Sequence, residues 1–367
     1  MRKPLGLYLH IPFCNQKCNY CTFFSVTPAE ELYNLYVKGL RRELKFFKQF
    51  GFTFDTFFVG GGTPTSIPPK VFEDIIKIIM EELAIESLKE FTVEVNPESL
   101  TDDHIVLFKD LGINRISIGA QSFIEEELRF LGRSHGVKDI HKAYYKLREA
   151  GFKNINLDIM FGFKGQSLKS LGYTLEQVIQ LAPEHISTYS LSYEKGAIKD
   201  LRLNDEQVLA SMFTLNKTLL ENSGYLRYEI SNYAKPGFES LHNLKYWMHN
   251  FYIGLGPSAS GYYLNGKDLL RYKNTRSMVK YAKMEREYET LSPEEWLLEE
   301  IFLKTRTKWG IEVKDERIRK KIKEELGEYT ILKEGRVILN DRGLLVHDAI
   351  SLKIGEIYES SGKQIYV

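Results

Sequence analysis

The three cysteines are the most informative residues of this 367-residue chain. Cys14, Cys18 and Cys21 follow one another with the spacing Cys-x3-Cys-x2-Cys, in a loop that also carries Asn, Gln and Lys. Three thiolates on one loop can bind three irons of a [4Fe-4S] cluster. Electron carriers of the ferredoxin type supply four cysteines, and this chain has no fourth. The fourth iron would then stay open to an outside ligand, which a chemical site needs and an electron carrier does not.

Other interpretations of the same cysteines stay open. A zinc ion bound by three cysteines and one histidine would take His10 as its fourth ligand, although zinc sites usually use two separated pairs. Inert buried thiols are a second alternative, against which the polar residues of the loop argue. A disulfide framework suits an odd number of cysteines in a chain of this size poorly.

The composition describes a large globular chain with little net charge. Hydrophobic residues make up 43% of the chain, and 50 basic residues face 49 acidic ones, which gives a net charge of +1. This balance argues against nucleic acid or an anionic membrane as the main partner. No apolar run approaches the roughly 20 residues of a membrane span, and no signal-peptide pattern precedes the first predicted strand. Together with the clustered cysteines, these features predict a cytoplasmic protein.

Strand and helix patterns alternate along most of the chain. Apolar runs near residues 6–11, 54–59, 91–95, 115–118, 155–160 and 186–191 predict six strands, each followed by a helical pattern. Successive βα units imply parallel strands with right-handed crossovers. The sequence therefore predicts an α/β fold, either a partial (β/α)6 TIM-like barrel of parallel strands or a doubly wound sheet.

Residues that could take part in binding or catalysis lie at or near the ends of these predicted strands. The cysteines follow the first strand, Gly60, Gly61 and Gly62 the second and Gln121 the fourth, while Glu94 and Asp158 lie in the third and fifth. The carboxyl ends of barrel strands share one mouth, so this coincidence favours the barrel. A carboxylate in an apolar strand is costly unless it is hydrogen-bonded, and it could accept hydrogen bonds from ribose hydroxyls or an amino group. The glycines allow a ligand to approach closely, or form a tight turn.

The last part of the chain has a different pattern. Helical patterns near residues 293–304 and 313–325 precede short strand patterns near 329–332 and 337–339 and a final helix. We predict a small α+β, winged-helix-like C-terminal domain over residues 292–367. The barrel domain would cover residues 1–225, and residues 226–291 would connect the two.

The connecting region carries a histidine beside two aromatic residues, in the stretch His242-Asn243-Leu244-Lys245-Tyr246-Trp247. Imidazole is a strong ligand for haem iron, and flat aromatic rings can pack against a porphyrin. Spacing alone favours the simpler interpretation, a core histidine among packed aromatic rings.

Taken together, these motifs resemble a known family. The cysteine spacing, with Tyr20 before the last cysteine, resembles the radical S-adenosylmethionine (SAM) superfamily. More specifically, the chain resembles the oxygen-independent coproporphyrinogen III oxidase family over most of residues 5–265. The shared motifs are Tyr8-x-His10-Ile11-Pro12-Phe13-Cys14, Gly60-Gly61-Gly62-Thr63-Pro64-Thr65, Glu94-Val95-Asn96-Pro97, Gln121-Ser122-Phe123, Leu131-Gly132-Arg133-x-His135 and Asp158-Ile159-Met160-Phe161-Gly162. The C-terminal domain also resembles that of the family, which is called the HemN type.

The resemblance implies a fold and a role for individual residues. The barrel would be a radical SAM core, and Cys14, Cys18 and Cys21 would hold the [4Fe-4S] cluster, whose open iron takes the amino and carboxylate groups of SAM. The SAM site would be lined by Tyr8, Gly61, Gly62, Thr63, Glu94, Gln121, Arg133 and Asp158.

Two departures distinguish the chain from the true coproporphyrinogen oxidases. Those enzymes carry a further cysteine two positions after the last cluster cysteine, where this chain has Phe23, and a longer arm before the cluster, where only seven residues precede Tyr8. The haem-chaperone branch (HemW type) instead has Cys-x-Phe and an H-N-x-x-Y-W motif. The chain resembles this branch, which implies a chaperone that binds haem and transfers it to an acceptor protein. His242 would face the haem, with Tyr246 and Trp247 as packing surface.

Two other functions are kept as alternatives. In a radical enzyme, a reduced cluster would cleave SAM, and the resulting radical would start the oxidative decarboxylation of a porphyrinogen. The missing fourth cysteine argues against this activity, and no catalytic residue is assigned. A zinc-bound interaction protein is the third candidate. The acceptor of the haem, the cleavage of SAM, covalent or axial haem attachment, a transient contact with a membrane protein and the choice between monomer and dimer stay open.

Overall fold

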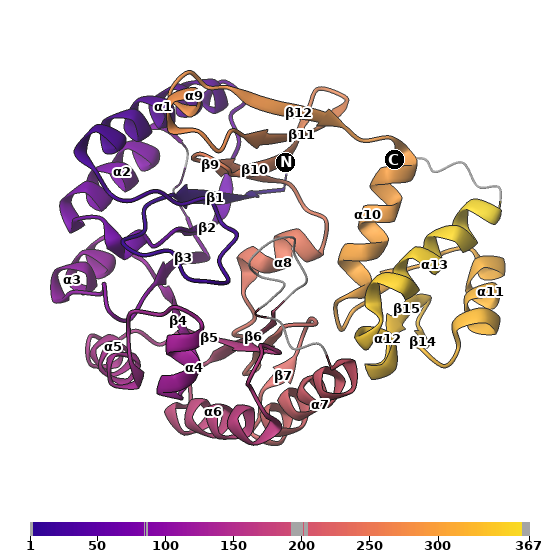
Figure 1. Ribbon diagram of the computed structural model, residues 1–367. Coiled ribbons are helices and arrows are strands. Elements are labelled where there is room, and N and C mark those ends of the chain that lie inside the picture. Colours follow the sequence, from indigo (N-terminus) through magenta and orange to yellow (C-terminus); the bar gives the residue numbers. More distant parts are fainter. Residues whose placement is uncertain (1–2, 84, 86, 192–200, 202–204, 362–367) are drawn as a thin grey trace.

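Six parallel strands form the centre of the protein in the order of the sequence (Figure 1). They are β1 (Leu5–Ile11), β2 (Phe54–Gly61), β3 (Glu90–Val95), β4 (Arg115–Gln121), β5 (Ile155–Phe161) and β6 (His185–Ser190). Each pairs in parallel with the next. The computed structural model describes residues 3–83, 85, 87–191, 201 and 205–361. The strands are almost entirely buried because both faces of a parallel sheet are covered, which is why they are visible as apolar runs. The predicted α/β fold with six βα units is confirmed.

Helices cover the outer side of the curved sheet, where Figure 1 shows all of them except the short α4 along the outside of the arc. They are α1 (Glu30–Lys48), α2 (Pro69–Glu82), α3 (Asp102–Asp110), α4 (Glu125–Phe130), α5 (Val137–Glu149), α6 (Leu168–Leu181) and α7 (Glu206–Asn222), with the 3-10 turn η1 (Pro64–Ser66) after β2. Each longer helix turns one apolar stripe to the sheet. Helix α1, for example, buries Tyr36, Leu40, Leu44 and Phe47. Each such side chain contributes about 1.5–3 kcal/mol of burial free energy.

Residues 226–291 add strands to both edges of this sheet. The elements are β7 (Leu226–Arg227), β8 (Asn232–Ala234), α8 (Leu241–Trp247), β9 (Tyr252–Leu255), β10 (Ser260–Asn265), β11 (Asp268–Asn274), α9 (Met278–Tyr281) and β12 (Arg286–Thr290). Strands β8 and β7 extend the β6 edge, and β9 to β12 extend the β1 edge, so that the described part of this sheet has twelve strands. Strand β9 is parallel to β1. The helix α8, which carries His242, lies inside the arc (Figure 1).

The C-terminal residues form a smaller α+β unit with its own core. It contains α10 (Pro293–Thr305), β13 (Ile311–Glu312), α11 (Glu316–Leu326), β14 (Thr330–Lys333), β15 (Arg336–Leu339), α12 (Asp341–Leu345) and α13 (His347–Ser360). The described strands pair antiparallel in the order β13-β15-β14. Helix α11 begins later than predicted because the side chain of Asp315 caps its first turn. The division of the chain at residues 225 and 291 stays a prediction.

None of the described helices combines the length and the apolar composition that crossing a membrane would require.

Candidate functional site

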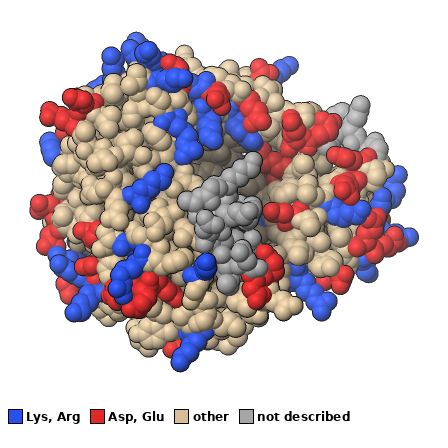
Figure 2. Space-filling model, viewed as in Figure 1, with Lys and Arg blue, Asp and Glu red and all other residues tan. Residues whose placement is uncertain are grey.

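The carboxyl ends of the six parallel strands surround a cavity of about 810 Å³, a size within the range of ligand pockets. All the predicted site residues except Trp247 line it. Alternate residues of a strand face the same side, and on β4 these are Arg115, Ser117, Gly119 and Gln121. Figure 2 shows this face of the molecule hollowed near its centre, with Lys and Arg side chains gathered beside the hollow. The fold thus brings distant parts of the sequence together around one volume.

The cysteine loop leaves β1 at the mouth of this cavity. Backbone hydrogen bonds from Cys14 N to Val26 O (3.0 Å) and from Val26 N to Pro12 O (2.7 Å) close its base. The three thiols are half-buried and free of disulfides. Burial is the main cause that raises the pKa of the Cys21 thiol. Nη1 of Arg133 donates to the Sγ of Cys18 at 3.4 Å, so a guanidinium lies against this thiol.

The donor set fits a four-iron cluster. In the described part of the chain, no three side chains of His, Cys, Asp or Glu lie close enough together to hold a single metal ion. A four-iron cluster takes each thiolate on a different iron, so it needs three thiols around one shared volume. Cys14, Cys18 and Cys21 all border the cavity and provide this arrangement.

His10, the fourth ligand of the zinc interpretation, is engaged elsewhere. Its Nε2 donates to Phe24 O at 2.9 Å, and its Nδ1 accepts from the Tyr8 hydroxyl at 3.1 Å. Burial lowers its pKa to about 4, so the ring is neutral at pH 7. Nε2 therefore holds the segment that follows the cysteines, Nδ1 is bonded to Tyr8 on β1, and the zinc interpretation loses its histidine.

The glycines after β2 are required by close contacts within the protein. Gly61 has a φ of +113°, and a Cβ at Gly62 would lie 2.5 Å from Phe13 O. Gly62 N donates to Ile11 O (2.8 Å) and Thr63 N to Phe13 O (2.7 Å). Gly61 N donates to Oε2 of Glu94 at 3.2 Å. Because these N–H groups donate to other atoms of the protein, the glycine loop holds β2 against the cysteine loop.

Two half-buried carboxylates, Glu94 and Asp158, lie in the cavity wall. Burial is the main cause that raises the pKa of Glu94 to about 7, and the charge of Asp158 adds to the effect. Burial also raises the pKa of Asp158, whose oxygens accept from Asn156 Nδ2 (2.7 Å) and Ser117 Oγ (3.1 Å). The pair is therefore suited to hydroxyl groups or to a positively charged ligand.

Arg133 and Gln121 complete the mouth. Nη2 of Arg133 donates to Asn96 Oδ1 (2.7 Å) and to Gly119 O (3.0 Å), which fixes the guanidinium beside the thiols. Gln121 ends β4 with a φ of +70°, a strained conformation for a residue other than glycine.

His242 lies buried in the wall of the cavity with both ring nitrogens hydrogen-bonded. Its Nδ1 lies 2.9 Å from Thr56 Oγ1, and its Nε2 lies 2.8 Å from the Tyr246 hydroxyl. Burial lowers its pKa to about 3, and the ring stacks on Phe58. In this state His242 has the contacts of a core histidine, although its ring borders the cavity.

Trp247 is the predicted site residue that does not line the cavity. The guanidinium of Arg306, from just after α10, lies 4.0 Å from the centre of its indole ring. Trp247 therefore packs against the C-terminal unit.

Sequence reasoning missed several residues of the cavity wall, including Arg115 on β4 and Asn156 on β5. The period of two along each strand could have found them by counting back from Gln121 and Asp158.

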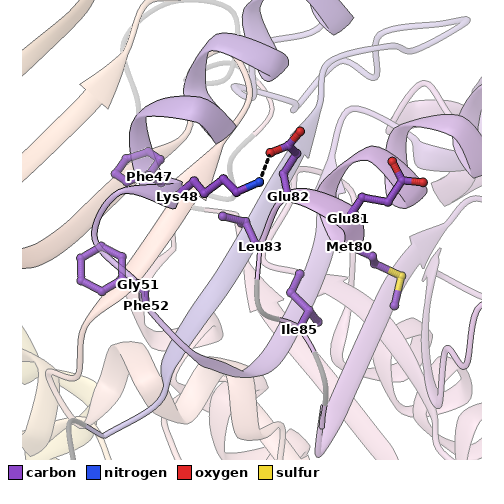
Figure 3. A pocket seen from close by; sticks show the side chains of 9 residues that line it. All are labelled: Phe47, Lys48, Gly51, Phe52, Met80, Glu81, Glu82, Leu83 and Ile85. Atoms are coloured by element: carbon purple, nitrogen blue, oxygen red, sulfur yellow. Dashed lines mark hydrogen bonds and ion pairs between the residues drawn. The ribbon is translucent and has the colours of Figure 1, made fainter.

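A second hollow of about 400 Å³ contains none of the predicted site residues (Figure 3). Phe47, Phe52, Leu83 and Ile85 form much of its apolar lining, beside an ion pair of 2.9 Å between Lys48 and Glu82. It lies next to the starts of β2 and β3, away from the cysteines.

Comparisons with known proteins agree with this picture. The family model of the radical SAM superfamily matches residues 8–178. The haem chaperone HemW of Lactococcus lactis is 36% identical over 323 residues, which cover 85% of this chain and 84% of that protein. The haem chaperone HemW of Escherichia coli is 39% identical over 264 residues, covering 70% of each chain. Among solved structures, the coproporphyrinogen III oxidase HemN of Escherichia coli, a radical SAM enzyme, has a TM-score of 0.82 at 20% identity, covering 96% of this chain and 90% of that chain. The structural match shows a common fold, and the sequence matches show that this chain belongs to the haem chaperone HemW family of the radical SAM superfamily.

Proposed function

We propose that this protein is a haem chaperone that binds haem, transfers it to an acceptor protein and carries a [4Fe-4S] cluster and SAM. One observation supports the proposal above all others. A single cavity is lined by the three cysteines, by every residue expected to line the SAM site, and by His242 and Tyr246 of the H-N-x-x-Y-W motif.

Cys14, Cys18 and Cys21 would hold the cluster, whose open iron supplies a binding position for the amino and carboxylate groups of SAM. Arg133 would stabilise the Cys18 thiolate. Glu94 and Asp158 would accept hydrogen bonds from the ligand and oppose the positive charge of its sulfonium. Tyr8, Gly61, Gly62, Thr63 and Gln121 would form the remaining wall of the SAM site.

We propose His242 as the haem-facing residue, although its hydrogen bonds must rearrange before it can bind iron. Because Nε2 is hydrogen-bonded to the Tyr246 hydroxyl, this nitrogen can bind iron only after that hydroxyl has moved. Tyr246 would then contact the porphyrin from the cavity wall, whereas Trp247 would hold α8 against the C-terminal unit.

The oxidative decarboxylation of a porphyrinogen is the second candidate function, because the fold is that of HemN and the cluster cysteines are present. Phe23 stands where the oxidases have a further cysteine, which favours the chaperone. Anaerobic incubation with coproporphyrinogen III and a reductant separates the two functions. Protoporphyrinogen IX formed over many turnovers would favour the enzyme.

We further propose a cytoplasmic location and no nucleic-acid partner. The near-neutral net charge of +1 supports the absence of a nucleic-acid partner. A transient contact with a membrane protein would suit delivery of haem to a membrane-bound acceptor, and either a monomer or a dimer is compatible with this function.

Haem titration of the reconstituted protein, followed by the Soret band, tests the role of His242. We expect His242→Ala to weaken haem binding by about tenfold or more, since an iron ligand is lost. Tyr246→Phe should tighten binding, because it frees Nε2 without removing the ring. His104→Ala is the matched control, because His104 is also buried with both ring nitrogens hydrogen-bonded, but lies outside the cavity. Equal affinities of the wild type and His242→Ala would contradict the assignment.

A further inference from the structure

The guanidinium of Arg115 is a buried charge that the described residues leave without a direct partner. Arg115 is 2% exposed and lines the cavity. Its Nε has no hydrogen-bond partner, and no hydrogen bond or ion pair joins its side chain to any described residue. An unpaired charge in the interior of a protein costs several kcal/mol, so such a group usually serves a ligand or a structural pair.

The nearby carboxylates do not use the donors of Arg115. Its charge lowers the pKa of both Glu94 and Asp158, which places it within electrostatic range of the two. The oxygens of Asp158 accept from Asn156 and Ser117, and Oε2 of Glu94 accepts from Gly61 N. The parallel N–H donors of the guanidinium therefore remain available for a ligand. Two parallel N–H donors match the two oxygens of a carboxylate.

Arg115 lies at the deep end of the cavity. It opens β4, whereas Gln121 at the mouth ends it, which corresponds to about 20 Å along the strand. Thr92, its partner in the pairing of β3 and β4, also has a buried hydroxyl without a hydrogen bond. Phe58 continues this row on β2 and stacks on His242. The unsatisfied guanidinium of Arg115 thus lines the end of the cavity that the H-N-x-x-Y-W helix borders, and a second buried polar group without a partner, the Thr92 hydroxyl, lies beside it in the sheet.

We propose that Arg115 is a carboxylate-binding residue at the floor of the cavity and that it takes a propionate of haem. The identity of the ligand rests on the proposed function, whereas the carboxylate chemistry rests on Arg115 alone. SAM also carries a carboxylate, but the cluster that would bind it lies at the mouth. The propionate is therefore the better match for the floor.

Two pairs of probes separate these carboxylates. Haem is compared with haem dimethyl ester, and SAM with decarboxylated SAM, by anaerobic titration of the reconstituted wild type and Arg115→Gln. We expect the wild type to bind haem about tenfold or more tightly than the ester, as for a hydrogen bond to a charged group. In Arg115→Gln this ratio should fall to about one, while affinity for the ester stays unchanged and shows that the cavity is intact. Arg115→Lys, which keeps the charge without the fork, should fall between the two.

Lys17→Gln is the control for charge alone, because Lys17 lines the same cavity from the cysteine loop at the mouth. It should keep the wild-type ratio of haem to ester. If Arg115→Gln and Arg115→Lys both keep that ratio, the propionate assignment is wrong, while haem binding by the wild type still supports the chaperone.

If the wild type binds no haem, the chaperone proposal and the propionate assignment fail together. Loss of discrimination against decarboxylated SAM in Arg115→Gln would then assign the floor to the carboxylate of SAM. If Arg115→Gln discriminates between haem and its ester, and between SAM and decarboxylated SAM, as the wild type does, Arg115 is not a carboxylate-binding residue.

Discussion

At the scale of single residues, burial sets the chemistry of the cavity. Glu94, Asp158 and His242 have few charged neighbours in direct contact, and burial is the first cause of each pKa shift. Burial thus raises the pKa of the two carboxyl groups and lowers that of the imidazole, so that the ring of His242 is neutral at pH 7.

The binding of SAM should depend on pH through Glu94. Its pKa of about 7 means that most of the carboxyl is protonated at pH 6 and ionised at pH 8. The sulfonium of SAM favours the ionised form, so affinity should rise about tenfold from pH 6 to pH 8 and then level off. Equilibrium dialysis of the reconstituted protein measures this. Glu94→Gln should give a flat profile, and a flat profile in the wild type would exclude Glu94 as the titrating group.

The same shift has a consequence for stability. The pKa of Glu94 is raised above the ordinary value of 4.5, so its protonated form favours the fold. This contribution is complete below about pH 4.5 and is lost as the pH rises through about 7. Thermal unfolding of the ligand-free protein provides an independent check of the sign.

At the scale of elements, Glu90 positions the helix that carries His242. Its Oε1 accepts from Ser240 Oγ (3.1 Å) and His242 N (3.0 Å), and its Oε2 accepts from Leu241 N (2.7 Å). A carboxylate at the N-terminus of a helix satisfies free N–H groups and complements the helix dipole. Strand β3 therefore sets where α8 begins, and with it the position of the imidazole.

Removing this carboxylate should loosen α8. Glu90→Ala leaves buried N–H groups unsatisfied and should lower the free energy of unfolding by about 2 kcal/mol. Haem binding should weaken in parallel, and Glu90→Gln, which keeps one acceptor, should recover part of both. Urea unfolding and the Soret titration measure the two effects. Glu81→Ala, at an exposed glutamate, is the control. Wild-type haem affinity in Glu90→Ala would show that α8 is positioned by other contacts.

The elements also show what could be predicted from the sequence. The six parallel strands were predictable because strands buried on both faces are continuous apolar runs. The edge strands β7 to β12 were missed because they are short or partly exposed and mix polar residues with tyrosines. Arg115 was missed because a charge at the start of a strand is typical of a solvated end. The state of His242 could not be predicted, since its partner Thr56 lies 186 residues away in the sequence.

At the scale of the whole molecule, a buried ion pair joins the connecting region of residues 226–291 to the C-terminal unit. Nε and Nη2 of Arg306 donate to Oε2 of Glu229 at 3.0 and 2.8 Å, and the side chain of Glu229 is fully buried. The same guanidinium covers the ring of Trp247. The last residue of the H-N-x-x-Y-W motif thus connects α8 to the C-terminal unit.

Arg306→Met should leave Glu229 buried and unpaired. We expect a loss of about 3 kcal/mol in the free energy of unfolding, together with faster proteolysis between the two units. Combining it with Glu229→Gln should restore much of the loss, because the uncompensated charge is then removed. Lys308→Met breaks a more exposed pair with Glu239 and should cost less than about 1 kcal/mol. Equal effects of the two single substitutions would contradict a special role for the buried pair.

The polar lining of the cavity has a consequence for the life of the protein in the cell. Without ligands, the chain encloses two carboxylates and a guanidinium that burial penalises. Ligands that bind the folded chain alone would remove this penalty by mass action. An empty chain would therefore unfold more often and be degraded sooner than a loaded one. The amount of the protein would then follow the supply of iron–sulfur clusters and SAM, without any change in its synthesis.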